Sequence, residues 1–406
     1  MAHLLLILLL STLIIACSSL VLSHSVVESL PGFEGPLPFE LETGYVGVDE
    51  SEDVQLFYYF VKSESNPKED PLILWLTGGP GCSAFSAFIY EIGPLYFEVK
   101  QNDGSLPTLV LNPNSWTKVA SILFVDLPVG TGFSYGTTSL ASKSTDLQSC
   151  DQAYEFLKKW LIDHSEFFSN PIYVGGDSYT GITVPIIVQL ISNGKKLSGN
   201  EVGIEPLINL KCIDGLNTYQ ILDPSCGVAS PKPQELFSER RSVDEKSIEL
   251  VVDRPSPCDS SLIHAYKLSH LWLNDDRVRE ALHIRKGSIG EWKRCASGLP
   301  YTQSIWDSFQ YHVNLSTKGY KFLIYSGDHD MVVPFLGTQA WIRALNYSIV
   351  DDWRSWWVQG QVAGYTRTYS NRMTFATVKG GEHIAPQDKP VECRAMFERW
   401  ISNQPL

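Results

Sequence analysis

The chain has 406 residues, of which 44% are apolar and 19% are charged, an ordinary composition for a globular protein with one large core or two domains. Its net charge is -13, and the sequence contains no cluster of Lys and Arg. Nucleic acids and anionic membranes are bound through clustered positive charge, so the composition argues against both as partners.

The first segment of the chain is apolar and short. Leu4–Ile15 is nearly all Leu and Ile, and the small residues Ala16–Ser19 follow it. This pattern predicts a signal peptide over residues 1–23 and a mature domain over 24–406 that enters the secretory pathway. An uncleaved anchor is the alternative, because weak apolarity continues to Leu22 and a membrane span needs about 20 residues. No later segment is apolar enough to span, so we expect no membrane association after signal removal.

Short apolar runs bounded by turn residues alternate with helical patterns along the chain. The expected strands are 54–61, 71–76, 121–125, 172–174, 322–325 and 373–378, and the expected helices are 150–161 and 182–191. This alternation predicts an α/β fold with a mainly parallel sheet and helices on both faces. Between about 194 and 317 the strand rhythm is lost, which indicates an insertion or cap on the sheet domain.

Seven cysteines follow the predicted signal peptide, and they agree with export. They are Cys82, Cys150, Cys212, Cys226, Cys258, Cys295 and Cys393. None shows C-x-x-C spacing, which argues against a zinc site, and scattered cysteines in an exported chain are usually disulfides. Because seven is odd, at least one thiol stays free or pairs with another chain. Asn314 and Asn346 lie in sequons and are predicted glycan acceptors in a secretory pathway.

Ser178 is a candidate nucleophile. It lies between the apolar run that begins at Ile172 and a helix start, with glycines at 175, 176 and 181. A nucleophile elbow needs this arrangement, because the sharp turn tolerates only small neighbours and presents the hydroxyl at the carboxyl end of the sheet. Thr180 stands where the strict G-x-S-x-G pattern has its last glycine. Taken alone, a serine here also fits a helix cap.

A serine nucleophile needs a histidine base and a carboxylate that orients the base, in the chain order Ser, acid, His for this class of fold. Of the six histidines after Ser178, only His383 lies in a Gly-rich loop just after an expected strand. The preceding expected strand ends in Ser-Gly-Asp-His-Asp, so Asp328 and Asp330 both qualify as the acid, and His329 between them fits a solvated loop residue.

A second glycine-rich loop follows an early expected strand. It reads Thr77-Gly-Gly-Pro-Gly-Cys-Ser83, and its glycines allow backbone N–H groups to approach a substrate closely. Hydrolases of this architecture place half of their oxyanion hole in such a loop. A tight turn ended by Pro80 is the alternative.

The chain resembles the serine carboxypeptidases and, more closely, the plant serine carboxypeptidase-like proteins, some of which are acyltransferases that use glucose esters. Five ordered motifs spread over nearly all of the mature chain carry this resemblance. They are Thr77-Gly-Gly-Pro-Gly-Cys-Ser, Asp126-Leu-Pro-Val-Gly-Thr-Gly-Phe-Ser-Tyr, Gly176-Asp-Ser-Tyr-Thr-Gly, Tyr325-Ser-Gly-Asp-His-Asp and Gly381-Glu-His-Ile-Ala-Pro. The resemblance implies an α/β-hydrolase fold and no cofactor.

The resemblance also implies roles for individual residues. It makes Ser178 the nucleophile, His383 the general base and Asp330 the orienting acid, and it places the oxyanion hole at the backbone N–H groups of Gly79 and Tyr179. The positions that bind the terminal carboxylate of the substrate in the peptidases correspond here to Trp75, Thr77, Glu91 and Asp177. The family pattern further suggests a disulfide between Cys82 and Cys295, with Cys226–Cys258 plausible. Cys150 lies on an expected helix, which predicts a buried free thiol.

Two departures from the family pattern bear on function. Thr77 replaces an amide donor and Asp177 a longer acid, changes that resemble the acyltransferase branch, although neutral drift would also explain them. The stretch 208–217 looks truncated, as if part of a strand and a helical insertion were missing. We therefore expect a serine carboxypeptidase or a glucose-ester-dependent acyltransferase that acts on a small ester or peptide. An inactive truncated relative, acting as a binding or vestigial protein, is the alternative.

Overall fold

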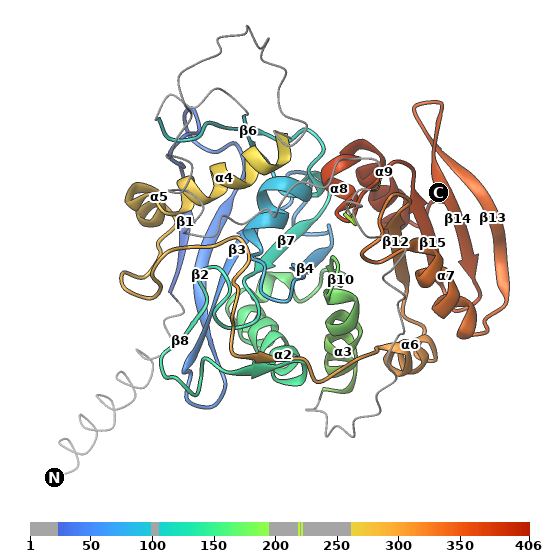
Figure 1. Ribbon diagram of the computed structural model, residues 1–406, viewed down its shortest axis with the longest axis horizontal. Helices are drawn as coiled ribbons and strands as arrows, with labels where there is room; N and C mark the ends of the chain where they lie inside the picture. The colour runs from blue at the N-terminus through green and yellow to red at the C-terminus, as the bar shows by residue number, and fades with distance from the viewer. Residues whose placement is uncertain (1–22, 99–104, 195–217, 220, 222–260) are drawn as a thin grey trace, which may run out of the picture.

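The computed structural model describes residues 23–98, 105–194, 218–219, 221 and 261–406 (Figure 1). The predicted signal peptide up to residue 22, the truncated stretch 208–217 and the Cys226–Cys258 pair lie outside the described residues. Among the described residues, no helix combines the length and apolarity that crossing a bilayer requires.

The first sheet holds the expected early strands. Its spatial order is β1 (Ser23–Val27), β2 (Leu41–Val48), β3 (Val54–Val61), β7 (Ser121–Val125), β4 (Leu72–Leu76) and β10 (Ile172–Gly176), with the short β8 (Tyr135–Gly136) beside β3. The strands β7, β4 and β10 are parallel, whereas β1, β2 and β3 join them as antiparallel neighbours. Every residue of β4 and β7 is buried, as their uninterrupted apolar sequences predict for strands covered on both faces.

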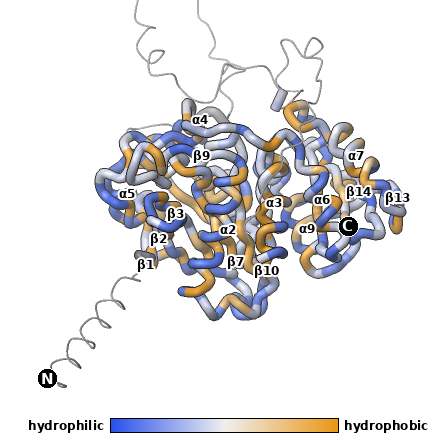
Figure 2. Tube along the Cα trace, turned by 90° about the horizontal axis from the view of Figure 1, so that it is seen from below, coloured by the Kyte–Doolittle hydropathy of each residue, from blue (hydrophilic) through white to orange (hydrophobic). Residues whose placement is uncertain are grey.

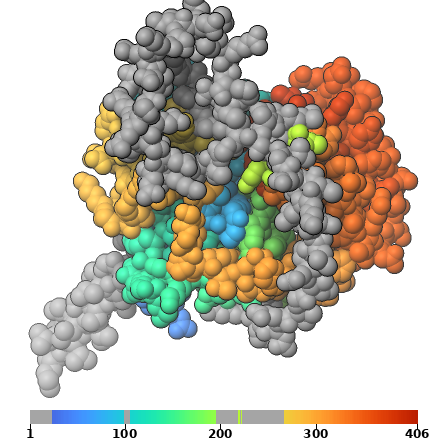
Figure 3. All heavy atoms as spheres, viewed as in Figure 1, coloured from blue at the N-terminus to red at the C-terminus, as the bar shows by residue number. Residues whose placement is uncertain are grey.

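A second sheet forms the other flank of the molecule, drawn in orange to red in Figures 1 and 3. Its order is β12 (Phe322–Gly327), β15 (Met373–Val378), β14 (Gln361–Tyr369) and β13 (Ile349–Val358). The pair β12 and β15 is parallel, and β14 and β13 continue the sheet as an antiparallel hairpin. Among the described residues, β10 is an end strand of the first sheet and β12 is an end strand of the second. Residues of the candidate site follow both strands.

Helices and short elements complete the structure. The α-helices are α2 (Asp146–Asp163), α3 (Thr180–Asn193), α4 (Ser261–Leu273), α5 (Asp276–Ala281), α6 (Phe309–Ser316), α7 (Phe335–Ala344), α8 (Ala385–Asp388) and α9 (Pro390–Ile401). The short elements are η1 (Ala87–Glu91), η2 (Trp116–Lys118), η3 (Ser165–Phe167), β5 (Leu95–Phe97), β6 (Leu109–Leu111), β9 (Ser144–Thr145) and β11 (Tyr301–Thr302). The described part of the expected cap region consists of α4, α5, β11 and α6.

The two faces of the first sheet carry separate cores. Along β4, Ile73 and Trp75 belong to one core, whereas Leu72, Leu74 and Leu76 belong to the other, as strand alternation requires. Side chains of α4, α5 and α9 fill the first core, and side chains of α2 and α3 fill the second. Figure 2 shows apolar segments gathered around β10 and α3. The expected placement of helices on both faces is confirmed, and the sheet is mixed, with its parallel strands nearest the site.

Candidate active site

Ser178 lies in a strained turn between β10 and α3. Its φ is 54°, a left-handed value that a non-glycine residue adopts only when the surrounding structure holds it there. The turn needs small neighbours: a Cβ added to Gly176 would lie 2.3 Å from the carbonyl oxygen of Leu76 on β4. This is the geometry of a nucleophile elbow, and it places the Ser178 hydroxyl at the carboxyl end of the parallel strands.

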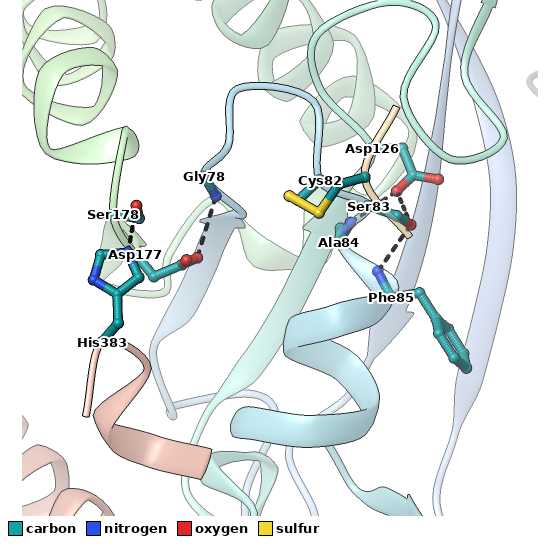
Figure 4. The surroundings of a disulfide bond; sticks show 10 residues. Gly78, Cys82, Ser83, Ala84, Phe85, Asp126, Asp177, Ser178 and His383 are labelled. Carbon is teal, nitrogen blue, oxygen red and sulfur yellow. Dashed lines mark hydrogen bonds between the residues drawn. A yellow bond between two sulfur atoms is a disulfide. The ribbon is translucent and has the colours of Figure 1, made fainter. Parts of the chain in front are cut away.

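His383 and Asp330 come from loops at the carboxyl ends of β15 and β12. The Nε2 atom of His383 lies 2.8 Å from Oγ of Ser178, and its Nδ1 lies 2.9 Å from Oδ2 of Asp330 (Figure 4 draws the first contact). The side chains of His383 and Asp330 are each only 5% exposed. A hydroxyl in contact with an imidazole that a buried carboxylate orients can lose its proton as it attacks a carbonyl carbon.

The geometry also separates the two candidate acids. Asp330 faces His383, and its second oxygen, Oδ1, accepts hydrogen bonds from the backbone N–H groups of Val332 and Val333 at 2.7 and 3.2 Å. Asp328 instead accepts a hydrogen bond from the backbone N–H of Gly380 at 2.6 Å. Asp328 therefore fixes the loop that carries the histidine, and Asp330 contacts the histidine itself.

The glycine-rich loop after β4 packs directly against the elbow. A Cβ added to Gly78 would lie 2.7 Å from Cβ of Ser178 and 2.9 Å from the backbone nitrogen of Tyr179, so only glycine fits. The next residue, Gly79, has a φ of 120°, which side chains disfavour. The structure thus brings the loop with Gly79 and the start of α3 with Tyr179 to the same place beside Ser178, where the sequence predicts an oxyanion hole.

Two anchors hold this loop. The carboxylate of Asp126 accepts hydrogen bonds from Oγ of Ser83 at 2.7 Å and from the backbone N–H of Ala84 at 2.8 Å (Figure 4). It also accepts a hydrogen bond from the backbone N–H of Phe133 at 2.8 Å. Burial of Asp126 raises its pKa to about 6. The expected disulfide between Cys82 and Cys295 is present and ties the loop to a segment 213 residues further along the chain.

Asp146 supports the elbow from the other side. Its Oδ1 accepts hydrogen bonds from the hydroxyl groups of Tyr179 at 2.7 Å and Tyr301 at 2.5 Å, and its Oδ2 accepts from the backbone N–H of Ile305 at 2.8 Å. No sequence pattern singles out Asp146 or assigns a role to Asp126. Most of their hydrogen-bond partners are distant in the chain, so only the fold identifies them.

The four residues expected to bind the substrate lie in or beside the same region. Trp75, Thr77 and Glu91 are buried, and Trp75 Nε1, Thr77 Oγ1 and Glu91 Oε2 have no hydrogen-bond partner among the described residues. Asp177 Oδ1 accepts a long hydrogen bond of 3.4 Å from the backbone N–H of Gly78. Burial raises the pKa of Asp177 to about 6, and burial together with the charge of Asp177 raises the pKa of Glu91 well above its usual value.

Arg294 is a further charged residue near these acids. Its charge lowers the pKa of both Glu91 and Asp177, against the larger effect of burial. Its guanidinium lies 4.0 Å from the ring centroid of Tyr266, and its Nε has no hydrogen-bond partner among the described residues. The sequence offered only its position next to Cys295 as a signal, and that did not distinguish it.

The remaining predicted residues are the two sequon asparagines and the free cysteine. Asn346 is exposed just after α7, whereas the Asn314 amide, in α6, donates a hydrogen bond to Gln189 at 3.0 Å, so Asn346 is the better placed glycan acceptor. Glycosylation at either residue stays a prediction. Cys150 is a buried free thiol, as expected, and Cys393 is a second one.

Comparison with known proteins agrees with this architecture. The yeast prohormone-processing carboxypeptidase Kex1(delta)p from Saccharomyces cerevisiae superposes with a TM-score of 0.68 at 20% identity, over 94% of this chain and 95% of its own. The fold is therefore that of the α/β hydrolases, as the sequence predicts.

Sequence comparison identifies the family. The serine carboxypeptidase family model matches residues 31–213 and 204–403. Serine carboxypeptidase-like 7 of Arabidopsis thaliana is 49% identical over 98% of each chain, and serine carboxypeptidase-like 17 of the same plant is 48% identical over 97% of each. The chain belongs to the serine carboxypeptidase family.

Proposed function

We propose that this protein is a serine-type acyl-transfer enzyme in which Ser178, His383 and Asp330 form the catalytic triad. The observation that carries the proposal is the pair of contacts of His383, 2.8 Å to the Ser178 hydroxyl and 2.9 Å to the Asp330 carboxylate. His383 takes the Ser178 proton while Oγ attacks the substrate carbonyl, and it then protonates the leaving group to give an acyl-enzyme. Backbone N–H groups of Gly79 and Tyr179 stabilise the oxyanion.

The substrate in this proposal carries an ester or peptide bond next to the acid-lined region. Trp75 Nε1, Thr77 Oγ1 and Glu91 Oε2, which are unpaired among the described residues, are the groups that would bind it. A substrate carboxylate is accepted only where an acid stays protonated, and the raised pKa of Glu91 supports that. If water attacks the acyl-enzyme, the enzyme is a carboxypeptidase. If an alcohol attacks it, the enzyme is a glucose-ester-dependent acyltransferase.

Thr77 and Asp177 favour the acyltransferase activity. A threonine hydroxyl at residue 77 offers a single hydrogen-bond donor where the peptidases have an amide. This replacement weakens binding of a terminal carboxylate. We also propose a secreted or vacuolar location, because the Cys82–Cys295 disulfide fits an oxidising compartment. The inactive alternative is disfavoured by the contact between Ser178 and His383, which a vestigial site has no reason to keep.

The test compares turnover of blocked dipeptides with turnover of phenolic glucose esters in the presence of alcohol acceptors. We expect Ser178→Ala and His383→Ala each to lower kcat by at least about 10⁴-fold with both substrate classes, while the thermal unfolding temperature stays close to that of the wild type. Near-normal turnover in either folded variant would show that the triad assignment is wrong. Preference for the glucose ester assigns the transferase, and preference for the dipeptide assigns the peptidase.

A further inference from the structure

A second cluster of reactive side chains lies on elements that contribute none of the triad residues. His24 is on β1, Glu42 is on β2, and His164 directly follows α2. One potential ligand atom from each lies within 4.8 Å of the other two. His24 is exposed, Glu42 is half-buried and His164 is buried, so the cluster runs from the surface into the protein.

The strand register explains how two of these residues meet. In the antiparallel pair of β1 and β2, His24 lies opposite Gly44 and Glu42 lies opposite Val26. His24 and Glu42 are therefore diagonal neighbours on one face of the sheet, and Gly44 has no side chain to separate them. The helix α2 packs on β2, and its end brings His164 over the same face.

The contacts of His164 decide which of its ring nitrogens can bind a cation. Its Nδ1 lies 2.9 Å from the carbonyl oxygen of Trp160, which can only accept a hydrogen bond, so Nδ1 carries a proton. In the neutral ring, Nε2 then has a lone pair, and it faces the two carboxylate oxygens of Glu42 at 3.1 and 3.2 Å. Two acceptors that face each other at this distance need a cation between them, either a proton or a metal ion.

The surroundings of the cluster resemble the outer shell of a metal site. A histidine ligand usually donates its other ring N–H to a carbonyl, as His164 does to Trp160. The Glu42 carboxylate is oriented by the Tyr58 hydroxyl, which donates to Oε1 at 2.6 Å. The His164 ring stacks on Trp160 with a centroid distance of 3.9 Å and an interplanar angle of 4°, and the C-terminal end of α2 favours positive charge.

We propose that His24, Glu42 and His164 bind a divalent transition-metal ion, with Zn²⁺ the best match to two imidazoles and one carboxylate. Zinc binds such ligands at about 2.0–2.2 Å in a tetrahedron, which separates ligand atoms by roughly 3.4 Å, and water completes the fourth position. His164 and Glu42 already have nearly this separation. Only His24 has to move closer; its side chain is exposed, and its ring centroid lies 5.3 Å from that of His164. The ion would fasten the edge strand β1 to β2 and α2.

The test is zinc titration of the mature protein after treatment with a chelator, by calorimetry and by thermal unfolding. We expect one Zn²⁺ per chain and a higher unfolding temperature with zinc. His24→Ala should fold normally and weaken zinc binding by at least about tenfold. His270→Ala is the matched control, because His270 and Glu291 form a second His–Glu pair, at 3.3 Å, outside the cluster, and it should leave binding unchanged.

Three outcomes would overturn the proposal. The first is the absence of saturable binding at one ion per chain, which would mean that a proton alone joins His164 to Glu42. The second is equal affinity in the wild type and His24→Ala. The third is a mature chain that begins after His24, which mass spectrometry of the N-terminal peptide detects directly.

Discussion

Two buried acids beside Ser178 keep protons that exposed carboxyl groups lose well below neutral pH. Burial raises the pKa of Asp177 to about 6 and the pKa of Glu91 well above its usual range. Below pH 6 both acids are largely neutral and can donate hydrogen bonds to a bound carboxylate. Above pH 6 Asp177 gains a negative charge, and this charge repels the same ligand.

Inhibition by a blocked amino acid should therefore depend on pH. We expect the inhibition constant of an N-blocked amino acid with a free carboxylate to rise above pH 6, by up to about tenfold per pH unit, because one proton is lost from the site. The corresponding amide has no carboxylate and serves as the control, with little change over pH 5 to 7. Equal pH profiles for the two inhibitors would contradict the assigned role of Asp177.

At the level of residues, the sequence predicted site residues that lie in recognisable motifs. It missed residues that only the fold brings next to the site. Ser178 and His383 were identified because each follows a strand within a glycine-rich motif. Motif spacing alone left Asp328 and Asp330 open, and only the family resemblance and the fold distinguish them. Arg294 could not be predicted, because a lone arginine in a polar region carries no pattern.

One of the two anchors of the loop after β4 is the carboxylate of Asp126. Asp126 receives three hydrogen bonds, from Ser83, Ala84 and Phe133, and the first two belong to the loop that contains Gly78 and Gly79. Because that loop packs against Ser178, loosening it should move the proposed oxyanion donors.

Asp126→Asn should damage both stability and turnover. An asparagine presents an NH₂ group to at least one of the three donors, so we expect a loss of about 1–3 kcal/mol in the free energy of unfolding. We also expect lower kcat, because the loop no longer holds its N–H groups in place. Asp70→Asn is the control: Asp70 accepts from Ser63 and Asn66 in another loop, so its loss should cost stability and leave kcat unchanged. Equal kcat in both variants would contradict the role of Asp126.

At the level of elements, buried strands were easier to predict than edge strands. The strands β3, β7 and β15 have the predicted bounds, because each is a mostly apolar run between polar segments. The edge strand β1 has the sequence Ser-His-Ser-Val-Val, which carries no strong strand signal, and its pairing with β2 specifies it. The hairpin of β13 and β14 was missed for a similar reason, since charged and polar residues interrupt both strands.

The proposed triad is assembled across two sheets. Ser178 follows β10 of the first sheet, whereas Asp330 and His383 follow β12 and β15 of the second, so the contact of 2.8 Å depends on how the sheets are held together. One connection is α9, whose Phe397 ring stacks on Trp116 with a centroid distance of 4.1 Å and an interplanar angle of 3°. The core around this stack contains residues of both sheets.

Removing that ring should weaken the whole molecule and its site. We expect Phe397→Ala to lower the free energy of unfolding by about 3–5 kcal/mol, as for other buried aromatic truncations, and to lower kcat in the folded fraction. Phe168→Ala is the control, because Phe168 is 61% exposed and its truncation should change stability by no more than about 0.5 kcal/mol. Unchanged kcat in folded Phe397→Ala would show that α9 does not position His383.

The most direct test of the account is labelling of the purified protein with a fluorophosphonate, followed by mass spectrometry of the labelled peptide. A serine activated by His383 should react once per chain, with the adduct on Ser178, and His383→Ala should lose the reaction while remaining folded. A stable, folded wild-type protein that never reacts at Ser178, under conditions in which a known serine hydrolase is fully labelled, would contradict the proposed enzyme activity.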